Sequence, residues 1–173
     1  MNDVAVTIRP TQPTDAPQLL QVMKKIGGET DFLIMDEHGL SLTEEQLAMQ
    51  LAAFLESANN LSLVALAGEK IIGMASVLAE DNPRVAHIGE VGISILKDYW
   101  GMGLGAAMME EIIWWAENSG VIRRLELTVQ TRNKRAIHLY QKFGFTQEGK
   151  MQRSFLTAQN EFIDAYLMAL LID

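Results

Sequence analysis

The sequence contains no cysteine among its 173 residues. This absence excludes disulfide bonds, a thiolate nucleophile and metal sites held by cysteine. Acyl transfer by this chain therefore cannot pass through an acyl-cysteine intermediate, and thiols give no information about the redox compartment.

Positive charge is also scarce. Fourteen Lys and Arg stand against 22 Asp and Glu, which gives a formal net charge of −8. No run of basic residues is dense enough to neutralise a row of phosphates, so we expect no nucleic-acid or membrane partner. No apolar run approaches the roughly 18 residues of a membrane span, and Met1 to Val4 lacks a basic signal start, so a cytoplasmic protein is expected.

Hydrophobic residues make up 49% of the chain, which is enough for a sizeable core. No repeat, low-complexity segment or linker marks a boundary, so a single domain over residues 1–173 is predicted. Hydrophobic periodicity predicts an α+β fold in the order βααβββαβαββ, with a parallel crossover near residue 101. The predicted strands are 4–8, 61–67, 71–79, 86–95, 124–130, 145–151 and 162–172. The predicted helices start at Thr14–Asp15, at a Ser41–Glu44 capping box, after Gly105 and at Lys134. The first of these helices is predicted to end at Gly27–Gly28.

Glycines alternate at positions 101, 103 and 105, between a predicted strand and the next helix. Without Cβ atoms, the backbone N–H groups of such a turn can approach an anion closely. The helix adds its unpaired first-turn N–H groups and the positive end of its dipole. The motif therefore predicts a turn that holds a pyrophosphate without a basic side chain.

Two other interpretations of this turn stay open. The glycines can serve only a tight turn and close packing of helix on sheet. Gly101, Gly103 and Ala106 also fit the dinucleotide fingerprint G-x-G-x-x-G/A, with Glu126 in place for a ribose, which would indicate an NAD(P)-binding oxidoreductase. Against this, residues 97–100 separate the strand from the glycines, and Glu126 lies inside a predicted strand.

A second motif, NKRAIHLYQKFGF, runs from Asn133 to Phe145. Together with YWGMGLG at residues 99–105, it resembles the GNAT superfamily of N-acetyltransferases. The first motif is similar to the family's acetyl-CoA signature (Q/R)-x-x-G-x-(G/A), and the second to its N-x-x-A-x-x-L-Y-x-K-x-G-F segment. One departure is Trp100, where the signature most often has Arg or Gln.

The resemblance implies a GNAT-like fold, with a central mixed, mostly antiparallel sheet of about seven strands flanked by about four helices. It also implies acetyl-CoA as the acyl donor and no metal, and it allows a homodimer. Asn133 would hydrogen-bond the cofactor arm, and the strand residues Ile93, Ser94 and Ile95 would pair with the pantetheine. The pyrophosphate would lie on the turn formed by Gly101, Met102, Gly103, Leu104, Gly105 and Ala106.

Acetyl transfer requires a neutral amine, a polarised thioester carbonyl and a proton for the departing thiolate. Tyr140 corresponds to the family's proton donor to the CoA sulfur; the alternative is a ring packed in the core. Glu90, an acid in an apolar strand, would accept the amine proton directly or through water; the alternative is a salt-bridged or exposed acid. The N–H near Ile93 would polarise the carbonyl, freed by a bulge that Gly92 permits.

The acceptor is not identified by the sequence. By resemblance it enters at the loop from Glu29 to Leu40, whose acids Asp31, Asp36 and Glu37 would attract an amine or merely be solvated. The main hypothesis is an N-acetyltransferase that acts by direct transfer in a ternary complex, on a primary amine of a small molecule or a protein. A non-catalytic acyl-CoA-binding or sensing module is the alternative.

Overall fold

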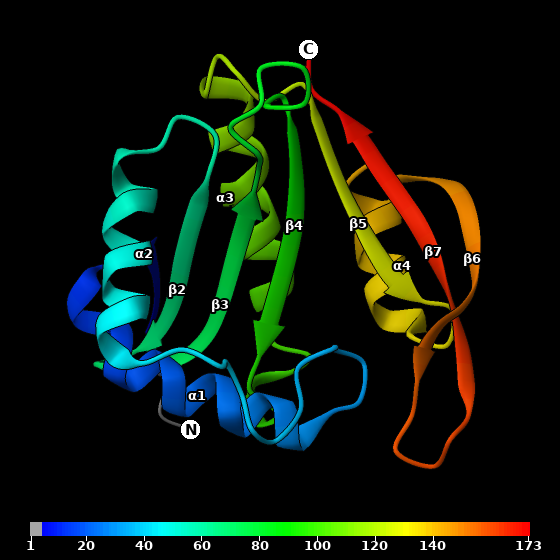
Figure 1. The fold of residues 1–173 in the computed structure, drawn as a ribbon, viewed down its shortest axis with the longest axis horizontal. Helices are drawn as coiled ribbons and strands as arrows, with labels where there is room; N and C mark the ends of the chain where they lie inside the picture. The colour runs from blue at the N-terminus through cyan, green and yellow to red at the C-terminus, as the bar shows by residue number, and fades with distance from the viewer. Residues whose placement is uncertain (1–4) are drawn as a thin grey trace.

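The computed structural model describes residues 5–173 (Figure 1). The predicted order of strands and helices is confirmed, with two short 3-10 helices added; Val4, predicted to begin the first strand, lies outside the described residues. The elements are β1 (Val6–Pro10), η1 (Pro13–Asp15), α1 (Ala16–Glu29), α2 (Glu44–Glu56), β2 (Leu61–Ala67), β3 (Lys70–Leu78), β4 (Ile88–Ile95), η2 (Lys97–Tyr99), α3 (Leu104–Asn118), β5 (Arg124–Gln130), α4 (Lys134–Lys142), β6 (Thr146–Leu156) and β7 (Phe162–Leu171).

All seven strands form one sheet in the order β1-β2-β3-β4-β5-β7-β6. Every neighbouring pair is antiparallel except β4 and β5, which are parallel. Helices α1 and α2 cover one face, and α3 and α4 cover the other (Figure 1). The predicted mixed, mostly antiparallel sheet is therefore confirmed.

The core lies between the helices and the sheet. On α3, Met108, Ile112 and Ala116 recur at four-residue spacing and are completely buried, as a helix with one apolar face requires. On α1, Leu19 and Ile26 are buried in the same way. The connected hydrophobic cluster extends over both halves of the sequence, which fixes the helices on the sheet.

The sheet opens between β4 and β5. Their parallel register runs only from Ile88 opposite Arg124 to Glu90 opposite Glu126. Strand β4 nevertheless stays paired with β3 as far as Ile95. Figure 1 shows β4 and β5 diverging below their short contact. Among residues 5–173, one edge of β4 is therefore left without a partner strand over its second half.

Helix α1 continues past the glycines that were predicted to end it. It includes Gly27 and Gly28 and stops at Glu29. A Cβ atom on Gly27 would lie 1.8 Å from the carbonyl oxygen of Asp36, in the loop after the helix. Gly27 thus permits the close approach of that loop, and the predicted stop was wrong because this contact is not local in sequence.

The helix starts also differ in detail from the predictions. The capping box of α2 is formed by Thr43 and Gln46, two residues later than the predicted Ser41–Glu44 pattern. The Thr43 hydroxyl accepts from the Gln46 N–H at 3.1 Å, and the Gln46 side chain accepts from the Thr43 N–H at 2.9 Å. Asp15 makes no capping bond to α1; its carboxylate instead accepts hydrogen bonds from Arg9 and from the backbone N–H of Gln12.

Candidate functional site

The free edge of β4 directs backbone groups toward the opening. The N–H of Leu96 donates to Ile72 of β3 at 2.9 Å. Backbone groups alternate between the two edges of a strand, so the N–H groups of Ile93 and Ile95 point away from β3, where β5 no longer pairs. The backbone groups of Ser94 point to β3.

The bulge predicted near Gly92 does not exist. The register between β3 and β4 runs from Glu90 to Ile95 without a shift. The donor at Ile93 is freed by the divergence of β4 from β5, which gives the predicted carbonyl-polarising N–H a different structural origin. Sequence alone could not reveal this, because the pairing partner lies more than thirty residues away.

Trp100 connects the end of the free β4 edge to the glycine turn through a hydrogen bond. Its indole N–H donates to the carbonyl oxygen of Ile95 at 2.8 Å. Between them, Lys97–Tyr99 forms the short helix η2. The strand thus does not run straight into the glycines, in contrast to the dinucleotide fingerprint.

The glycine turn uses backbone conformations that favour glycine. Gly101 and Gly103 have φ angles of +77° and +81°, and a Cβ on Gly103 would meet no atom within 4 Å. Gly105 lies inside the first turn of α3, where a Cβ would approach Leu139 of α4 to 3.1 Å. The turn therefore leaves open space in front of the N-terminus of α3 and brings α4 against it.

Leu104 and Ala106 share this first turn with Gly105, while Met102 is exposed at the tip of the turn. The first-turn N–H groups of a helix have no intrahelical acceptor. No acidic side chain occupies this turn of α3. These groups form a cradle that fits a pyrophosphate.

Asn133 and Tyr140 both lie on α4. Asn133 is the N-cap, and its side chain accepts from the N–H of Ala136 at 3.3 Å. Its amide NH₂ remains available as a donor. Tyr140 is half-buried with its ring 5.9 Å from that of Phe145, and burial raises the pKa of its phenol to about 12. The phenol is therefore protonated at neutral pH and can donate a hydrogen bond.

Glu90 is exposed on the face of the sheet opposite α3 and α4. The neighbouring Gly89 faces the core, where a Cβ would touch Val77 and Ile122. Glu90 lies opposite Glu126 in the parallel register and forms no salt bridge with any of the residues 5–173. The two predicted catalytic residues thus come from opposite faces of the sheet, with the opening between β4 and β5 separating the strands.

Glu126 is held by Arg124 at 2.7 Å, and the same guanidinium binds Glu148 of β6 through two hydrogen bonds. These bonds lower the pKa of Glu148. The ribose-binding role that a dinucleotide fingerprint would give Glu126 is therefore replaced by an ion pair within the sheet. Glu90 is left as the unpaired carboxylate beside it.

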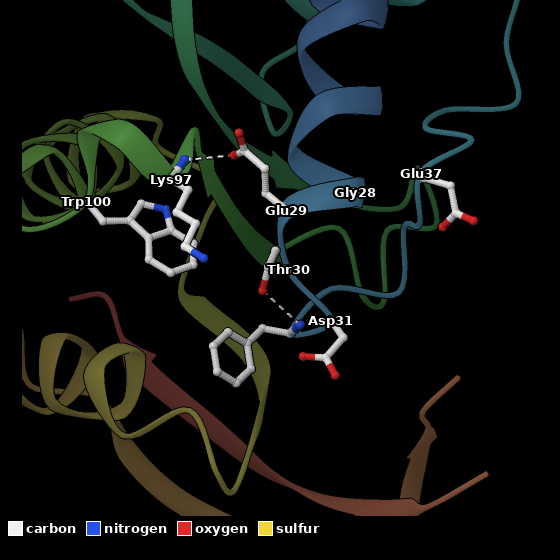
Figure 2. Close-up of a pocket in the computed structure, with 9 residues that line it drawn as sticks. Gly28, Glu29, Thr30, Asp31, Glu37, Lys97 and Trp100 are labelled. Atoms are coloured by element: carbon white, nitrogen blue, oxygen red, sulfur yellow. Dashed lines mark hydrogen bonds between the residues drawn. The ribbon is translucent and has the colours of Figure 1, made fainter. Parts of the chain in front are cut away.

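A pocket of about 520 Å³ lies between the end of α1, the following loop and η2 (Figure 2). The Glu29 carboxylate accepts from the backbone N–H of Lys97 at 2.8 Å, which joins its two sides. The pocket is lined by Gly27, Gly28, Glu29, Thr30, Asp31, Phe32, Glu37, Lys97 and Trp100. Because Trp100 lines the pocket and directly precedes Gly101, the pocket adjoins the glycine turn.

The loop that forms this pocket is fastened to the far end of β5. Asp31 pairs with Arg132 at 3.0 Å, and the Gln130 side chain donates to the Asp31 carbonyl at 2.9 Å. Arg132 also lies over the ring of Phe32, 5.3 Å from its centroid. Arg132 and Gln130 were not predicted as site residues, because no local sequence pattern connects them with the loop.

The three loop acids do not act alike. Asp31 is held by Arg132, and Asp36 accepts a hydrogen bond from the N–H of His38. Glu37 lines the pocket and forms no salt bridge within the part of the chain that the structure describes. Of the three predicted acids, Asp31 and Glu37 line the pocket, and of these two only Asp31 is held in an ion pair among residues 5–173.

Comparison with known proteins gives consistent results. The family model described as the acetyltransferase (GNAT) family matches residues 31–145, which include the glycine turn and α4. The chain belongs to the GNAT family of acetyltransferases. The expected family and fold are thereby confirmed.

Individual GNAT relatives support the assignment. The L-amino acid N-acetyltransferase AaaT of Escherichia coli is 33% identical over 107 residues, which cover 62% of this chain and 65% of that protein. The crystal structure of a GNAT-family acetyltransferase from Streptococcus pneumoniae is 43% identical, with a TM-score of 0.95 over 97% of this chain and 100% of that one.

A GNAT phosphinothricin acetyltransferase from Sinorhizobium meliloti, solved in complex with acetyl-CoA, shares the fold. Its TM-score is 0.82 at 18% identity, over 96% of this chain and 88% of that one. That protein binds acetyl-CoA within the same architecture.

Two further observations on this GNAT chain concern membranes and metal ions. Among residues 5–173, none of the helices is both long and apolar enough to span a bilayer. The same residues contain no group of three or more His, Asp or Glu side chains arranged to hold a metal ion.

Proposed function

We propose that this GNAT chain transfers an acetyl group from acetyl-CoA to a primary amine by direct transfer in a ternary complex. The observation that carries the proposal is the continuity of two features. The unpaired edge of β4 at Ile93 and Ile95 leads, through Trp100, into the open glycine turn at the start of α3. A pantetheine arm needs the first feature, and a pyrophosphate needs the second.

The chain's own groups would bind the donor as follows. The N–H of Ile95 and the carbonyl oxygen of Ile93 pair with the amides of the pantetheine, as an added strand would, which leaves the N–H of Ile93 for the thioester carbonyl. The first-turn N–H groups of α3 hold the pyrophosphate, with Gly103 leaving room for it. The amide of Asn133 donates to the cofactor arm.

The reaction forms a C–N bond and breaks a C–S bond. Glu90 accepts a proton from the amine, directly or through a water molecule, so that the nitrogen lone pair can attack the carbonyl carbon. The N–H of Ile93 stabilises the negative charge on the carbonyl oxygen in the tetrahedral intermediate. As the C–S bond breaks, Tyr140 gives its proton to the departing thiolate, and the tyrosinate takes up the proton that leaves the new amide nitrogen. Because cysteine is absent, no acyl-enzyme on sulfur is possible, which supports direct transfer.

The acceptor would enter through the pocket beside Trp100. Glu37 supplies an unpaired negative charge there, and Phe32 supplies an apolar surface fixed by Arg132. Both suit an amine that arrives as a cation and carries an apolar group. The amines that belong to this class include amino acids, peptides and small alkylamines.

The test is release of CoA thiol in the presence of acetyl-CoA and a panel of amines, followed with a thiol-reactive dye. The assay has no protein background, since the chain has no cysteine. Amine-dependent thiol release at a one-to-one ratio with acetylated product supports the proposal. Saturable binding of acetyl-CoA without release of CoA thiol in the presence of any amine would instead favour a non-catalytic acyl-CoA-binding module.

A further inference from the structure

Arg135 lies beside the glycine turn although it belongs to α4, thirty residues further along the chain. Its guanidinium is 5.7 Å from the centroid of the Trp100 ring, within the range of a cation–π contact. A Cβ on Gly101 would lie 3.1 Å from one of its terminal nitrogens. The cation is thus in contact with the turn that is proposed to hold the pyrophosphate.

The ring under this guanidinium is fixed. Trp100 donates its indole N–H to the Ile95 carbonyl oxygen at 2.8 Å, so that the ring cannot swing away without losing that bond. Arg135 itself is exposed and forms no salt bridge with any of the residues 5–173. Its position is set by a neutral surface, and its five N–H donors remain free for an anion.

The placement of Arg135 opposes the local electrostatics of its helix. Positions 134 and 135 form the first turn of α4, where the helix dipole favours acidic residues, and no acid is present there. Two cations at this end lower the stability of the helix. Local rules of this kind are broken most often at functional sites.

The N-terminus of α3 adds a second positive end at the same place. Gly105, in the first turn of α3, is in close contact with Leu139 of α4, so the start of α3 lies against the helix that carries Arg135. A chain with a net charge of −8 thereby concentrates positive potential at one spot.

From these contacts we infer that Arg135 binds the pyrophosphate of acetyl-CoA and supplies, from α4, the positive charge that position 100 lacks in this sequence. The inference rests on the proposed acetyl-CoA-dependent function. In it, Trp100 is a positioning residue that holds the guanidinium over the turn. Arginine suits this role because its planar fork stacks on the indole while it donates two parallel hydrogen bonds to phosphate oxygens.

The experiment compares Arg135→Gln with Lys134→Gln by calorimetric titration with acetyl-CoA. Both changes remove one exposed positive charge from the first turn of α4, and both variants should retain the thermal stability of the wild type or exceed it. We expect Arg135→Gln to raise the Kd by about tenfold or more, the loss typical of a charge-assisted hydrogen bond. Lys134→Gln should change the Kd by less than about threefold, and Arg135→Lys should fall between these values.

Truncated donors separate a contact with the pyrophosphate from other effects. Acetyl-dephospho-CoA lacks the 3′-phosphate but keeps the pyrophosphate, so the penalty of Arg135→Gln should persist with it. S-acetyl-pantetheine lacks all phosphates, so wild type and Arg135→Gln should use it equally. A penalty that disappears with acetyl-dephospho-CoA, or one that remains with S-acetyl-pantetheine, would overturn the assignment.

The proposed function and this inference fail in different ways. If the wild type does not bind acetyl-CoA, the function itself is wrong, and the inference falls with it. If the wild type binds acetyl-CoA and releases thiol, while Arg135→Gln and Lys134→Gln weaken binding equally, only the role of Arg135 is wrong.

Discussion

The two sides of the proposed site differ in the groups that they present to a ligand. On the donor side, the edge of β4 and the start of α3 present backbone N–H groups, shaped by Gly101 and Gly103. On the acceptor side, the pocket is lined mainly by side chains of a loop that Arg132 fastens to the rest of the protein. The donor side depends on main-chain geometry, and the acceptor side depends on side-chain identity.

This difference suggests how one family can use one donor with many acceptors. A backbone cradle tolerates changes of side chain as long as the glycines remain. A pocket held by ion pairs and exposed loop side chains can be altered by single substitutions without disturbing the sheet. Variants should therefore separate donor binding from acceptor binding cleanly.

Tyr140→Phe is expected to have the largest effect, because it removes the proton donor while keeping the ring and its contact with Phe145. The kcat should fall by about a hundredfold or more, with the Kd for acetyl-CoA unchanged. Since the pKa of Tyr140 is about 12, its phenol stays protonated throughout the assay range, and the loss should be the same at pH 6 and pH 9. Steady-state kinetics and titration of both proteins at the two pH values provide the check; weaker acetyl-CoA binding would indicate a packing role instead.

Glu90→Gln tests the opposite face of the sheet. Loss of the proton acceptor should lower kcat/KM by about ten- to a hundredfold at neutral pH. The deficit should shrink as the pH rises toward the pKa of the acceptor amine, since the amine then arrives neutral. Glu126→Gln is the matched control, because Glu126 is the neighbouring carboxylate in register and is already held by Arg124. Equal losses in the two variants would argue for a general charge effect.

Gly103→Ala tests the backbone cradle. Gly103 and Gly120 both have positive φ and open space where a Cβ would go, and they lie before and after α3 respectively. Each alanine should therefore cost about 1 kcal/mol of stability, measured by denaturant unfolding. Only Gly103→Ala should weaken acetyl-CoA binding, by about tenfold, because the added methyl group enters the space in front of the first-turn N–H groups. If Gly120→Ala weakened binding as much, backbone strain and not obstruction would be the cause.

Arg132→Ala tests the fastening of the acceptor loop and should have the smallest effect. It removes the ion pair with Asp31 and the contact with the Phe32 ring. The KM for the amine should rise about three- to fivefold, while the Kd for acetyl-CoA stays constant, and stability should change by less than about 1 kcal/mol. Both constants are measured on the same preparation. If the Kd for acetyl-CoA rose together with the KM for the amine, the two sides of the site would not be independent.

The local geometry of the proposed donor side was largely predictable from sequence, and that of the proposed acceptor side was not. The glycine turn and the segment from Asn133 to Phe145 are each a continuous stretch of sequence, so their residue types predict their local geometry. The contact between Arg132 and Asp31 joins residues about a hundred positions apart, and no periodicity encodes it. The same limit explains the wrong helix stop at Gly27, whose partner Asp36 lies in the following loop.

The opening of the sheet shows an intermediate case. Strands β4 and β5 were predicted as separate strands with a parallel crossover between them, which the structure confirms. Their divergence after Glu90 depends on how each packs against its other neighbour, so a local bulge at Gly92 was predicted in its place. The roles of Glu90, Ile93, Asn133 and Tyr140 remain predictions that the variants above examine.

The central claim is that the unpaired edge of β4 and the glycine turn together bind acetyl-CoA. Its most direct test is a calorimetric titration of the wild-type chain with acetyl-CoA, with NADH titrated under identical conditions. The account predicts saturable binding of one acetyl-CoA per chain and no binding of NADH. Binding of NADH without binding of acetyl-CoA would contradict it and would return the glycines to a dinucleotide-binding or purely structural role.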